Sequence, residues 1–333
     1  MPRKVVRLFS EMNEPLRWGL IGSGWIAGSF AADLAFTDSG RVIAVGSRRL
    51  ETANRFADRF DIPNRHANYE ALVADPEVDV VYVATPHPMH HQNTLLALRA
   101  GKPVLVEKAF TMNAAEAREL VAVARAERLF LMEAMWTRFL PHVARIRRLI
   151  AEGALGEIVT IGADHGQWFA KDPNFRLFAP ELGGGALLDL GVYPVSFASM
   201  LLGAPDTIVA LIEPAFSGVD GQTSMLLGYA SGAQAVLTCT SLARSPTRAA
   251  IVGSEARIEI EGDFYTPSPF TLITRTGKRT SYDEPHQGRG LWYQADEVAR
   301  CLRGGLLESP LMPLDESISI MQTMDAVLAQ APR

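Results

Sequence analysis

The sequence has few cysteines, and this excludes one class of protein. Only Cys239 and Cys301 occur among its 333 residues. Two thiols cannot form the disulfide framework of a small secreted protein, whereas they are ordinary in a reducing cytosol. We expect both thiols to be buried and chemically inert.

The chain also lacks an excess of positive charge. Its 32 lysines and arginines are outnumbered by 37 aspartates and glutamates, which gives a formal net charge of -5 at pH 7. Such a protein has no general basic field with which to attract nucleic acid or an anionic membrane surface. We therefore expect neither as a partner.

Long apolar runs are absent as well. No segment offers the roughly 20 uninterrupted apolar residues that a membrane-spanning helix needs. Residues 1–15 mix Arg3, Lys4 and Arg7 with Glu11 and Glu14 and contain no apolar run, so they do not resemble a signal peptide. These absences predict a cytoplasmic protein.

What is present is an α/β pattern that changes near residue 136. A chain of 333 residues exceeds what a single core usually organises. Residues 14–136 alternate short apolar runs with helical patterns, which is typical of a Rossmann domain with a doubly wound parallel sheet. Residues 137–333 predict a second α/β domain with a large, mostly antiparallel open sheet, used for substrate binding and oligomerisation.

The expected elements follow from hydrophobic periodicity and from turn residues. In the first part we expect strands at 16–21, 42–45, 78–84 and 104–106, and helices at 26–36, 51–60, 90–100 and 113–127. In the second part we expect helices at 142–151, 186–202, 293–302 and 317–328. Its strands are expected near 158 and at 224–229, 234–240, 249–252 and 257–260.

A glycine-rich turn follows the first expected strand and precedes a helix. The segment Gly22-Ser23-Gly24-Trp25-Ile26-Ala27 fits the dinucleotide fingerprint in its Ala-ending form. Gly22 permits a tight turn, and Gly24 lets a pyrophosphate approach the backbone amides at the positive end of the helix. A turn that merely joins two elements is the alternative, but the context favours cofactor binding by Gly22, Gly24, Trp25 and Ile26.

The end of the second expected strand indicates which dinucleotide binds. An NAD site usually carries Asp or Glu about 20 residues after the glycines. Here Ser47, Arg48 and Arg49 end the strand, and the first acid is Glu51. Ser47 can donate a hydrogen bond to a 2′-phosphate and Arg48 can pair with it, which favours NADP over NAD. The alternative is that the two arginines are only solvated surface charges.

Two further expected strands end in polar residues, where ligands of open parallel sheets bind. The residues expected to line the cofactor crevice there are Thr85, Pro86, His87, His90, Glu107 and Lys108. The histidines at 87, 90 and 91 predict no metal site, because no cysteine or acidic ligand pattern accompanies them. Lys108 stands out, because a lysine at a buried strand end can polarise a nearby hydroxyl group.

A triple-glycine segment, residues 183–185, opens the apolar helix expected at 186–202. This helix carries Asp189 and Tyr193, which are four residues apart and therefore project from one face. Burying either group unpaired would be costly. A helix cap or a core hydrogen bond is the alternative explanation, and it is weaker for Tyr193 than for Asp189.

Together, these motifs resemble the glucose-fructose oxidoreductase, inositol dehydrogenase and rhizopine catabolism (Gfo/Idh/MocA) family, from about residue 16 to the end of the chain. Residues 133–139 resemble the branch that contains dimeric dihydrodiol dehydrogenase and NADP-dependent xylose dehydrogenase. The resemblance implies a Rossmann domain followed by an α/β domain whose open sheet commonly supports oligomerisation. A homodimer or a homotetramer is therefore expected.

The resemblance also implies roles for individual residues. Lys108 would lie near the nicotinamide and the substrate hydroxyl, Tyr193 would be the general acid/base, and Asp189 would orient substrate or catalytic groups. The implied substrate-binding residues further include Trp136, Arg138 and Arg176. One departure is that the family usually has Pro after Glu-Lys, where this chain has Ala109, and this leaves the rigidity of the Lys108 loop open.

We therefore predict an NADP-dependent oxidoreductase that acts on a hydroxyl- or carbonyl-bearing carbon of a sugar, cyclitol or dihydrodiol. Tyr193, assisted by Lys108, would take the hydroxyl proton in a cleft shared by the two domains. An alternative from another class is an NAD(P)-binding regulatory protein that keeps the fold without catalysis. The presence of Lys108, Asp189 and Tyr193 favours the enzyme.

Overall fold

A computed structural model describes residues 14–331, which form two compact units. The first unit comprises residues 14–111, 115–136 and 287–317, and the second comprises 112–114, 137–286 and 318–331. The sequence assigns all of 137–333 to one domain, whereas the structure includes 287–317 in the first unit. Residues 1–13, which carry most of the segment that does not resemble a signal peptide, lie outside the described residues.

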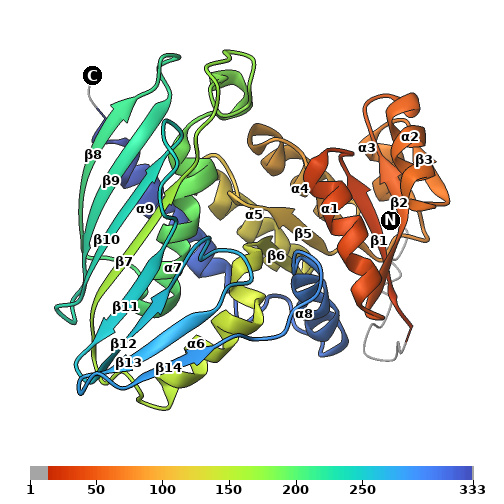
Figure 1. Ribbon diagram of the computed structural model, residues 1–333. Coiled ribbons are helices and arrows are strands. Elements are labelled where there is room, and N and C mark those ends of the chain that lie inside the picture. Colours follow the sequence, from red (N-terminus) through yellow and green to blue (C-terminus); the bar gives the residue numbers. More distant parts are fainter. Residues whose placement is uncertain (1–13, 332–333) are drawn as a thin grey trace. The chain divides into compact units, whose positions relative to one another are not determined.

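The first unit is built on a six-stranded sheet in which all neighbouring strands are parallel (Figure 1). Its strands are β1 (Leu16–Ile21), β2 (Gly40–Gly46), β3 (Asn64–His66), β4 (Val80–Val83), β5 (Val104–Glu107) and β6 (Leu131–Ala134). Their spatial order, β3-β2-β1-β4-β5-β6, confirms the predicted doubly wound Rossmann sheet. The order reverses between β1 and β4, and ligands of such sheets bind beyond the carboxyl ends at this point.

Helices connect these strands, as the alternating pattern predicts. The connecting helices are α1 (Trp25–Asp33), α2 (Leu50–Phe60), α3 (Tyr69–Ala74), α4 (His90–Arg99) and α5 (Ala114–Glu127), with short 3-10 helices at Leu34–Phe36 and His87–Met89. A 3-10 helix, Trp136–Phe139, follows β6, and α8 (Trp292–Arg303) lies in the segment that returns to this unit late in the sequence. Strands β4, β5 and β6 are buried along their whole length, as expected of strands covered on both faces. The sequence analysis missed β3, which is short and polar, as well as α3 and β6.

Hydrogen bonds to α1 and to the turn after it hold residues 287–317 in the first unit. The buried Asp33 carboxylate accepts hydrogen bonds from the amides of Arg289 (3.1 Å) and Leu291 (2.7 Å). The Thr37 hydroxyl donates to Asp296 on α8 at 2.6 Å. These partners are more than 250 residues apart in the sequence, so local patterns could not predict this return of the chain.

The second unit is built on an eight-stranded sheet with the order β14-β13-β12-β11-β7-β10-β9-β8. Its strands are β7 (Ile158–Gly166), β8 (Thr207–Pro214), β9 (Asp220–Gly228), β10 (Gln234–Thr240), β11 (Ala249–Gly253), β12 (Ala256–Ile260), β13 (Phe270–Thr274) and β14 (Arg279–Tyr282). The β7–β10 pair is parallel and the other pairs are antiparallel, which confirms the mostly antiparallel sheet.

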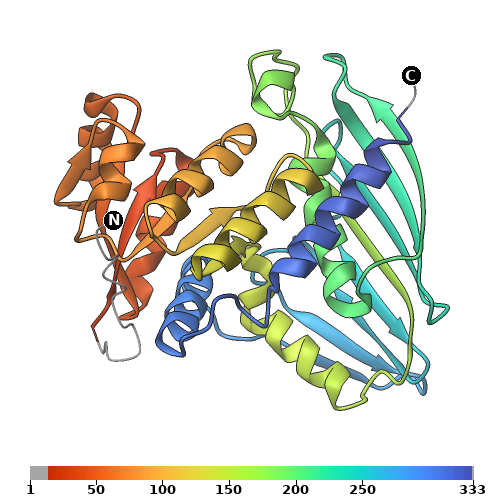
Figure 2. The same ribbon diagram turned by 180° about the vertical axis from the view of Figure 1, so that it is seen from behind.

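Helices of the second unit gather on one face of its sheet. They are α6 (Pro141–Ala151), α7 (Val192–Leu202) and α9 (Leu314–Leu328), and both views show α7 and α9 along the same face (Figures 1 and 2). Among the described residues, no helix covers the other face. Strands β9 and β10 accordingly alternate between buried and more exposed residues.

The stretch Pro180–Leu202 is long and apolar enough, by length and composition alone, to span a membrane. From the sequence, no segment of roughly 20 uninterrupted apolar residues was expected. This stretch is 78% buried within the structure, and it includes α7, which packs against β7 and β10. A helix that is apolar on all sides is also typical of a protein core.

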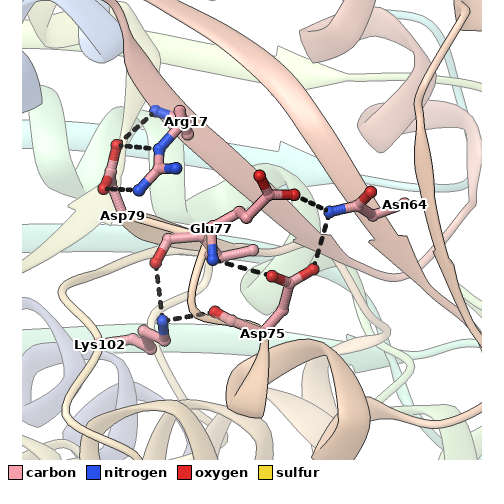
Figure 3. A network of polar contacts seen from close by, with 7 residues as sticks. Arg17, Asn64, Asp75, Glu77, Asp79 and Lys102 are labelled. Carbon is pink, nitrogen blue, oxygen red and sulfur yellow. Dashed lines mark hydrogen bonds and ion pairs between the residues drawn. The ribbon is translucent and has the colours of Figure 1, made fainter.

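A polar network joins the amino ends of the first sheet's strands, opposite the ligand edge (Figure 3). The Arg17 guanidinium on β1 donates two hydrogen bonds to Asp79, at 2.9 and 3.0 Å. Lys102 donates to the carbonyls of Asp75 and Val78, and Asn64 donates to Asp75 and Glu77. Burial raises the pKa of Asp75, but hydrogen bonds from the Glu77 amide, His66 and Asn64 outweigh it and lower that pKa overall.

We expect the substitution Asp79→Ala to lower the free energy of unfolding by about 3 kcal/mol, because it leaves a partly buried guanidinium without its carboxylate. The Asp79 side chain is 2% exposed and the Arg17 side chain 23%. The control Glu51→Ala removes an exposed ion pair with Arg55 and should cost less than about 0.5 kcal/mol. Urea unfolding of both variants tests this, and equal losses would contradict it.

Candidate active site

The glycine turn at the end of β1 is shaped by a close approach of two backbones. Gly22 has a φ of +105°, and a Cβ atom there would lie 2.6 Å from the carbonyl oxygen of Ala84. Only glycine combines this conformation with this contact. At Gly24, by contrast, an added Cβ would meet no atom within 4 Å. The chain itself therefore leaves space at Gly24, as a bound pyrophosphate would require.

The amino end of α1 has no anionic or capping side chain of its own. Its N-cap residue is Gly24, no side chain caps the helix, and its first turn contains no acidic residue. The first amide groups of a helix lack partners within the helix and carry partial positive charge. The chemistry of this end therefore fits a phosphate group. Trp25 is 69% exposed beside it, whereas Ala27 is fully buried against the sheet.

The end of β2 presents a hydroxyl group and a cation without an acid. Ser47 is buried, and its amide donates to the carbonyl of His66 on β3 at 3.2 Å. Arg48 is exposed. Burial raises the pKa of Tyr69, and the positive charge of Arg48 offsets part of this rise. Glu51 is directed toward Arg55 in an exposed ion pair. This donor set fits a 2′-phosphate better than a ribose hydroxyl.

His90 connects the loops that follow β4 and β5. It is fully buried, and its two ring nitrogens lie 2.8 Å from the carbonyl oxygens of Thr85 and Ala109. Burial and the Lys108 ammonium lower the pKa of His90 to about 4, although the two carbonyls act in the opposite direction. At neutral pH the ring is therefore uncharged and donates to only one of the two carbonyls. His90 therefore has a structural role between these two loops. His87 is also buried, and its ring centroid lies 5.5 Å from that of His90.

Glu107 and Lys108 leave the carboxyl end of β5 together. The buried Glu107 carboxylate accepts the Tyr82 hydroxyl from β4 and, at 3.2 Å, the Lys108 amide. Lys108 itself is half-buried, and the peptide bond to the buried Ala109 is cis. Nδ1 of His90 lies 2.8 Å from the Ala109 carbonyl oxygen, so the buried ring packs against this loop, where the family proline is missing. Of the other predicted residues here, Thr85 is buried and Pro86 is exposed.

In the second unit, tight contacts explain the glycines before the helix. Gly183 and Gly185 have φ values of +70° and +128°. A Cβ atom at Gly185 would lie 2.1 Å from the Asp220 carboxylate, and one at Gly184 would lie 2.8 Å from the carbonyl of Leu177. Asp220 in turn accepts a hydrogen bond from the Leu187 amide at 2.6 Å. The glycines thus let a carboxylate from β9 reach the start of the helix.

Asp189 and Tyr193 are both buried near the start of this helix. Asp189 lies in a single π-helical turn, Leu187–Gly191, and Tyr193 lies in the first turn of α7. The half-exposed Arg176 forms an ion pair with Asp189 at 2.9 Å. The four-residue spacing predicted that Asp189 and Tyr193 project from one face of an α-helix. Asp189 instead lies in a wider, π-helical turn, which changes this geometry. The ion pair brings together two of the residues predicted to bind substrate.

Two aromatic rings lie beside the Tyr193 ring, and Gln167 bonds to both of them; none of these three residues was predicted from the sequence. His165 on β7 and Tyr265 have ring centroids 5.2 and 4.7 Å from that of Tyr193, and 4.3 Å from each other. Gln167 donates to the Tyr265 hydroxyl and to Nε2 of His165, so Nδ1 of His165 carries the proton donated to the Leu190 carbonyl. The polar end of β7 was a weak sequence signal for His165, but no pattern indicated Tyr265.

Arg138 fixes the helix that carries Tyr193. It is 2% exposed and donates to the hydroxyl and carbonyl of Ser196, one turn after Tyr193, at 3.0 and 2.9 Å. These bonds give Arg138 a positioning role, and its predicted contact with substrate stays a prediction. Trp136, at the end of the first unit, is also buried.

Both cysteines are buried and free, as predicted. Burial raises the pKa of the Cys239 thiol above its usual value and that of Cys301 to about 12. Neither thiol is therefore a nucleophile at neutral pH. Cys301 contacts the Glu297 carboxylate on α8, within the first unit.

Asp220 predicts a pH-dependent stability. Burial raises its pKa to about 6 in the folded protein, from an ordinary value of 3.8. The folded state therefore holds this proton more tightly, and the resulting stability is present below pH 3.8 and is lost as the pH rises through 6. We expect Asp220→Asn, which keeps an acceptor oxygen without the charge, to gain stability relative to the parent between pH 5 and 7.5.

The expected gain is at most about 3 kcal/mol. Thermal unfolding of parent and variant across this pH range measures it. The control Asp206→Asn changes an exposed carboxylate in the same unit and should show no such trend. A stability difference for Asp220→Asn that stays constant or shrinks as the pH rises would contradict the assignment.

Comparisons with known proteins agree with the geometry of both units. Residues 16–135 match the model of the oxidoreductase family with an NAD-binding Rossmann fold, and residues 143–259 match the GFO/IDH/MocA C-terminal domain. Trans-1,2-dihydrobenzene-1,2-diol dehydrogenase of Xenopus tropicalis is 39% identical over 326 residues, which cover 94% of this chain and 97% of that protein. D-xylose 1-dehydrogenase (NADP(+)) of Hypocrea jecorina is 37% identical, with 95% and 92% covered.

A solved structure shows the same architecture with a cofactor bound. The 3-ketoreductase KijD10 from Actinomadura kijaniata, in complex with NADP and TDP-benzene, superposes with a TM-score of 0.84. It is 29% identical, and the match covers 95% of this chain and 98% of that protein. From the two matching domain models and the relatives that align over nearly their whole length, we conclude that this chain belongs to the GFO/IDH/MocA family of oxidoreductases.

Proposed function

We propose that the protein is an NADP-dependent oxidoreductase that transfers a hydride to or from a carbon of a sugar, cyclitol or dihydrodiol. The observation that carries this proposal is the carboxyl edge of the first sheet. This edge of the first unit carries three features that suit a dinucleotide. They are the uncapped amino end of α1, the end of β2 without an acidic residue, and the Glu107–Lys108 pair. The named activities of relatives, on dihydrobenzene diol and on xylose, support the substrate class.

The choice of NADP rests on the end of β2. Ser47 and Arg48 offer a hydroxyl donor and a cation, and no carboxylate stands where it would repel a 2′-phosphate. The xylose dehydrogenase is named for NADP(+), and KijD10 was solved with NADP. Both findings support the same cofactor here. The diphosphate would lie on the amides that follow Gly22.

The bound NADP supplies a nicotinamide ring that accepts or donates the hydride. For oxidation, we infer that the Tyr193 phenolate oxygen takes the proton of the substrate hydroxyl group. For Lys108 we infer the role that the family resemblance implies, which is to polarise the substrate hydroxyl group with its positive charge. In the reverse direction the same phenol returns the proton to the developing alkoxide.

The Asp189–Arg176 pair would orient the substrate. A carboxylate accepts hydrogen bonds from hydroxyl groups, and a half-exposed guanidinium donates them, so the pair matches a compound with adjacent oxygens. His165 and Tyr265 pack against the Tyr193 ring, and Gln167 bonds to both of them. Trp136 and Arg138 complete the residues proposed for this site.

Two substitutions test the chemistry. We expect Tyr193→Phe and Lys108→Met each to lower kcat by about 10²- to 10⁴-fold, because each removes a group from proton transfer. Tyr229→Phe is the matched control, because the buried Tyr229 hydroxyl has no partner among the described residues. Lys278→Met removes an exposed lysine. Steady-state kinetics and an NADP titration measure all four variants. Turnover that persisted in Tyr193→Phe and Lys108→Met would contradict the assignment.

A substrate panel identifies the activity. Aldoses, cyclitols, keto sugars and aromatic dihydrodiols should be mixed with NADP or NAD while the absorbance of the reduced nicotinamide is followed. We expect turnover with at least one class and a preference for NADP. Tight NADP binding without turnover of any compound in the panel would instead indicate a regulatory protein without catalysis.

We further propose that the protein is a cytoplasmic homo-oligomer, a dimer or a tetramer, that uses the uncovered face of the second sheet. Val209, Leu226 and Val236 pair with one another across β8, β9 and β10, and are 55%, 43% and 53% exposed. Leu211, two residues after Val209 on β8, is 76% exposed and adds further apolar surface to the same face. Such a patch is unusual on a monomer and supports self-association.

The patch predicts the effect of a charge at its centre. Leu226→Glu should shift the protein toward monomers, because burying a carboxylate in an apolar interface is unfavourable. Leu50→Glu, at an exposed leucine of the first unit, is the control and should leave the mass unchanged. Sedimentation velocity of both variants and the parent decides the matter. An unchanged oligomer in Leu226→Glu would exclude this face as the interface.

A further inference from the structure

The loop 287–291 is attached to the far end of helix α1. The Asp33 carboxylate, in the last residue of α1, accepts the amides of Arg289 and Leu291. The Trp292 indole donates to the Gln287 carbonyl at 3.1 Å and closes the loop. Gly288 has a φ of +60°, and a Cβ atom there would lie 2.6 Å from the Asp33 carboxylate, so this position favours glycine. The backbone of the loop is therefore fixed on α1, within the first unit.

The Arg289 side chain extends from this anchor toward the start of α1. Its guanidinium carbon lies 4.8 Å from the ring centroid of Trp25, the first residue of the helix. Trp25 and Asp33 are eight residues apart, which corresponds to about 12 Å along a helix. A long side chain is needed to cover most of this length. Arg289 thus places its charge against the ring of Trp25, the residue that follows Gly24 of the glycine turn, although its backbone is attached at the other end of α1.

The exposed guanidinium on Trp25 is not accompanied by an acidic residue in the first turn of α1. The amino end of a helix carries partial positive charge, so a guanidinium there is unfavourable unless an anion accompanies it. The first turn of α1 has no acidic residue. In the part of the chain that the structure describes, no carboxylate pairs with Arg289. Two positive features of this helix, its first amides and the guanidinium on Trp25, therefore have no anionic partner among the described residues.

The stacking on Trp25 leaves Arg289 able to bind such an anion. A cation–π contact occupies the flat face of the guanidinium, while its N–H groups point outward in the plane. Those N–H groups can form two parallel hydrogen bonds to one phosphate. The exposed Trp25 ring holds the guanidinium in place before the ligand arrives. Less side-chain freedom is then lost on binding.

We propose that Arg289, held by Trp25, binds the diphosphate of the dinucleotide from the side opposite the helix amides. This inference rests on the proposed function, because it assigns one more residue to the same cofactor site. It extends that site to a loop that is about 260 residues away from the glycine turn in the sequence. A diphosphate is common to NADP and NAD, whereas only NADP carries the 2′-phosphate expected at Ser47 and Arg48.

The test is the affinity of purified full-length variants for NADP and NAD, measured by isothermal titration calorimetry. Arg289→Ala should raise Kd about tenfold or more for both cofactors, because it removes a charge-assisted phosphate contact. Arg289→Lys should lose part of this affinity, since an ammonium keeps the charge but not the planar fork. Trp25→Ala should also weaken binding. Added to Arg289→Ala, it should cost less than on its own, because the two residues act together.

Arg59→Ala is the matched control. Arg59 also stacks on an aromatic ring, with its guanidinium carbon 5.0 Å from the Phe60 centroid, and it is exposed in the same unit. It lies in the last turn of α2, which runs away from the ligand edge, so its loss should leave both affinities unchanged. The thermal midpoints of all variants without cofactor check that the unit is still folded.

Three outcomes overturn the inference or its basis in different ways. Unchanged affinity of Arg289→Ala for both cofactors would show that Arg289 does not bind the dinucleotide. A loss for NADP alone would place the arginine at the 2′-phosphate and contradict the diphosphate assignment. If the parent protein bound neither cofactor, the proposed function itself would fail, and this result is distinct from the other two.

Discussion

The carboxyl edge of the first sheet, where ligands bind, depends on the contacts of the buried His90 imidazole. Its two nitrogens lie 2.8 Å from the carbonyl oxygens of Thr85 and Ala109, and the ring donates to one of them, so one buried side chain packs between the loops after β4 and β5. These loops carry the residues proposed to contact the nicotinamide, and Lys108 immediately precedes Ala109. Because burial keeps the ring neutral, the link adds no charge of its own beside the lysine. A rigid, uncharged connection leaves the Lys108 ammonium as the local cation.

A comparable constraint operates in the second unit, where a buried carboxylate and three glycines set the start of a helix. Asp220 contacts the Leu187 amide, and the absence of a side chain at Gly185 makes this contact possible. The π-helical turn that follows places Asp189 against Arg176, and α7 then carries Tyr193 among His165 and Tyr265. In both units, tight contacts near the backbone set the positions from which the reactive side chains project.

The sequence was most informative where a local pattern has a single physical cause. Strands 16–21 and 234–240 were predicted with their observed bounds, because buried strands carry an uninterrupted or alternating apolar pattern. The glycine turn was predictable for a similar reason, since a φ of +105° leaves little choice of residue. The return of 287–317 to the first unit and the ring of Tyr265 beside Tyr193 depend on distant contacts. Short windows of sequence contain no trace of such contacts.

The central claim is that the carboxyl edge of the first sheet binds NADP. A crystal structure of the protein soaked with NADP measures this most directly. The account predicts diphosphate oxygens at hydrogen-bond distance, about 3 Å, from the amides that follow Gly22, and a 2′-phosphate beside Ser47 and Arg48. A dinucleotide found at another edge of the sheet, or one whose 2′-phosphate points away from Ser47 and Arg48, would contradict it.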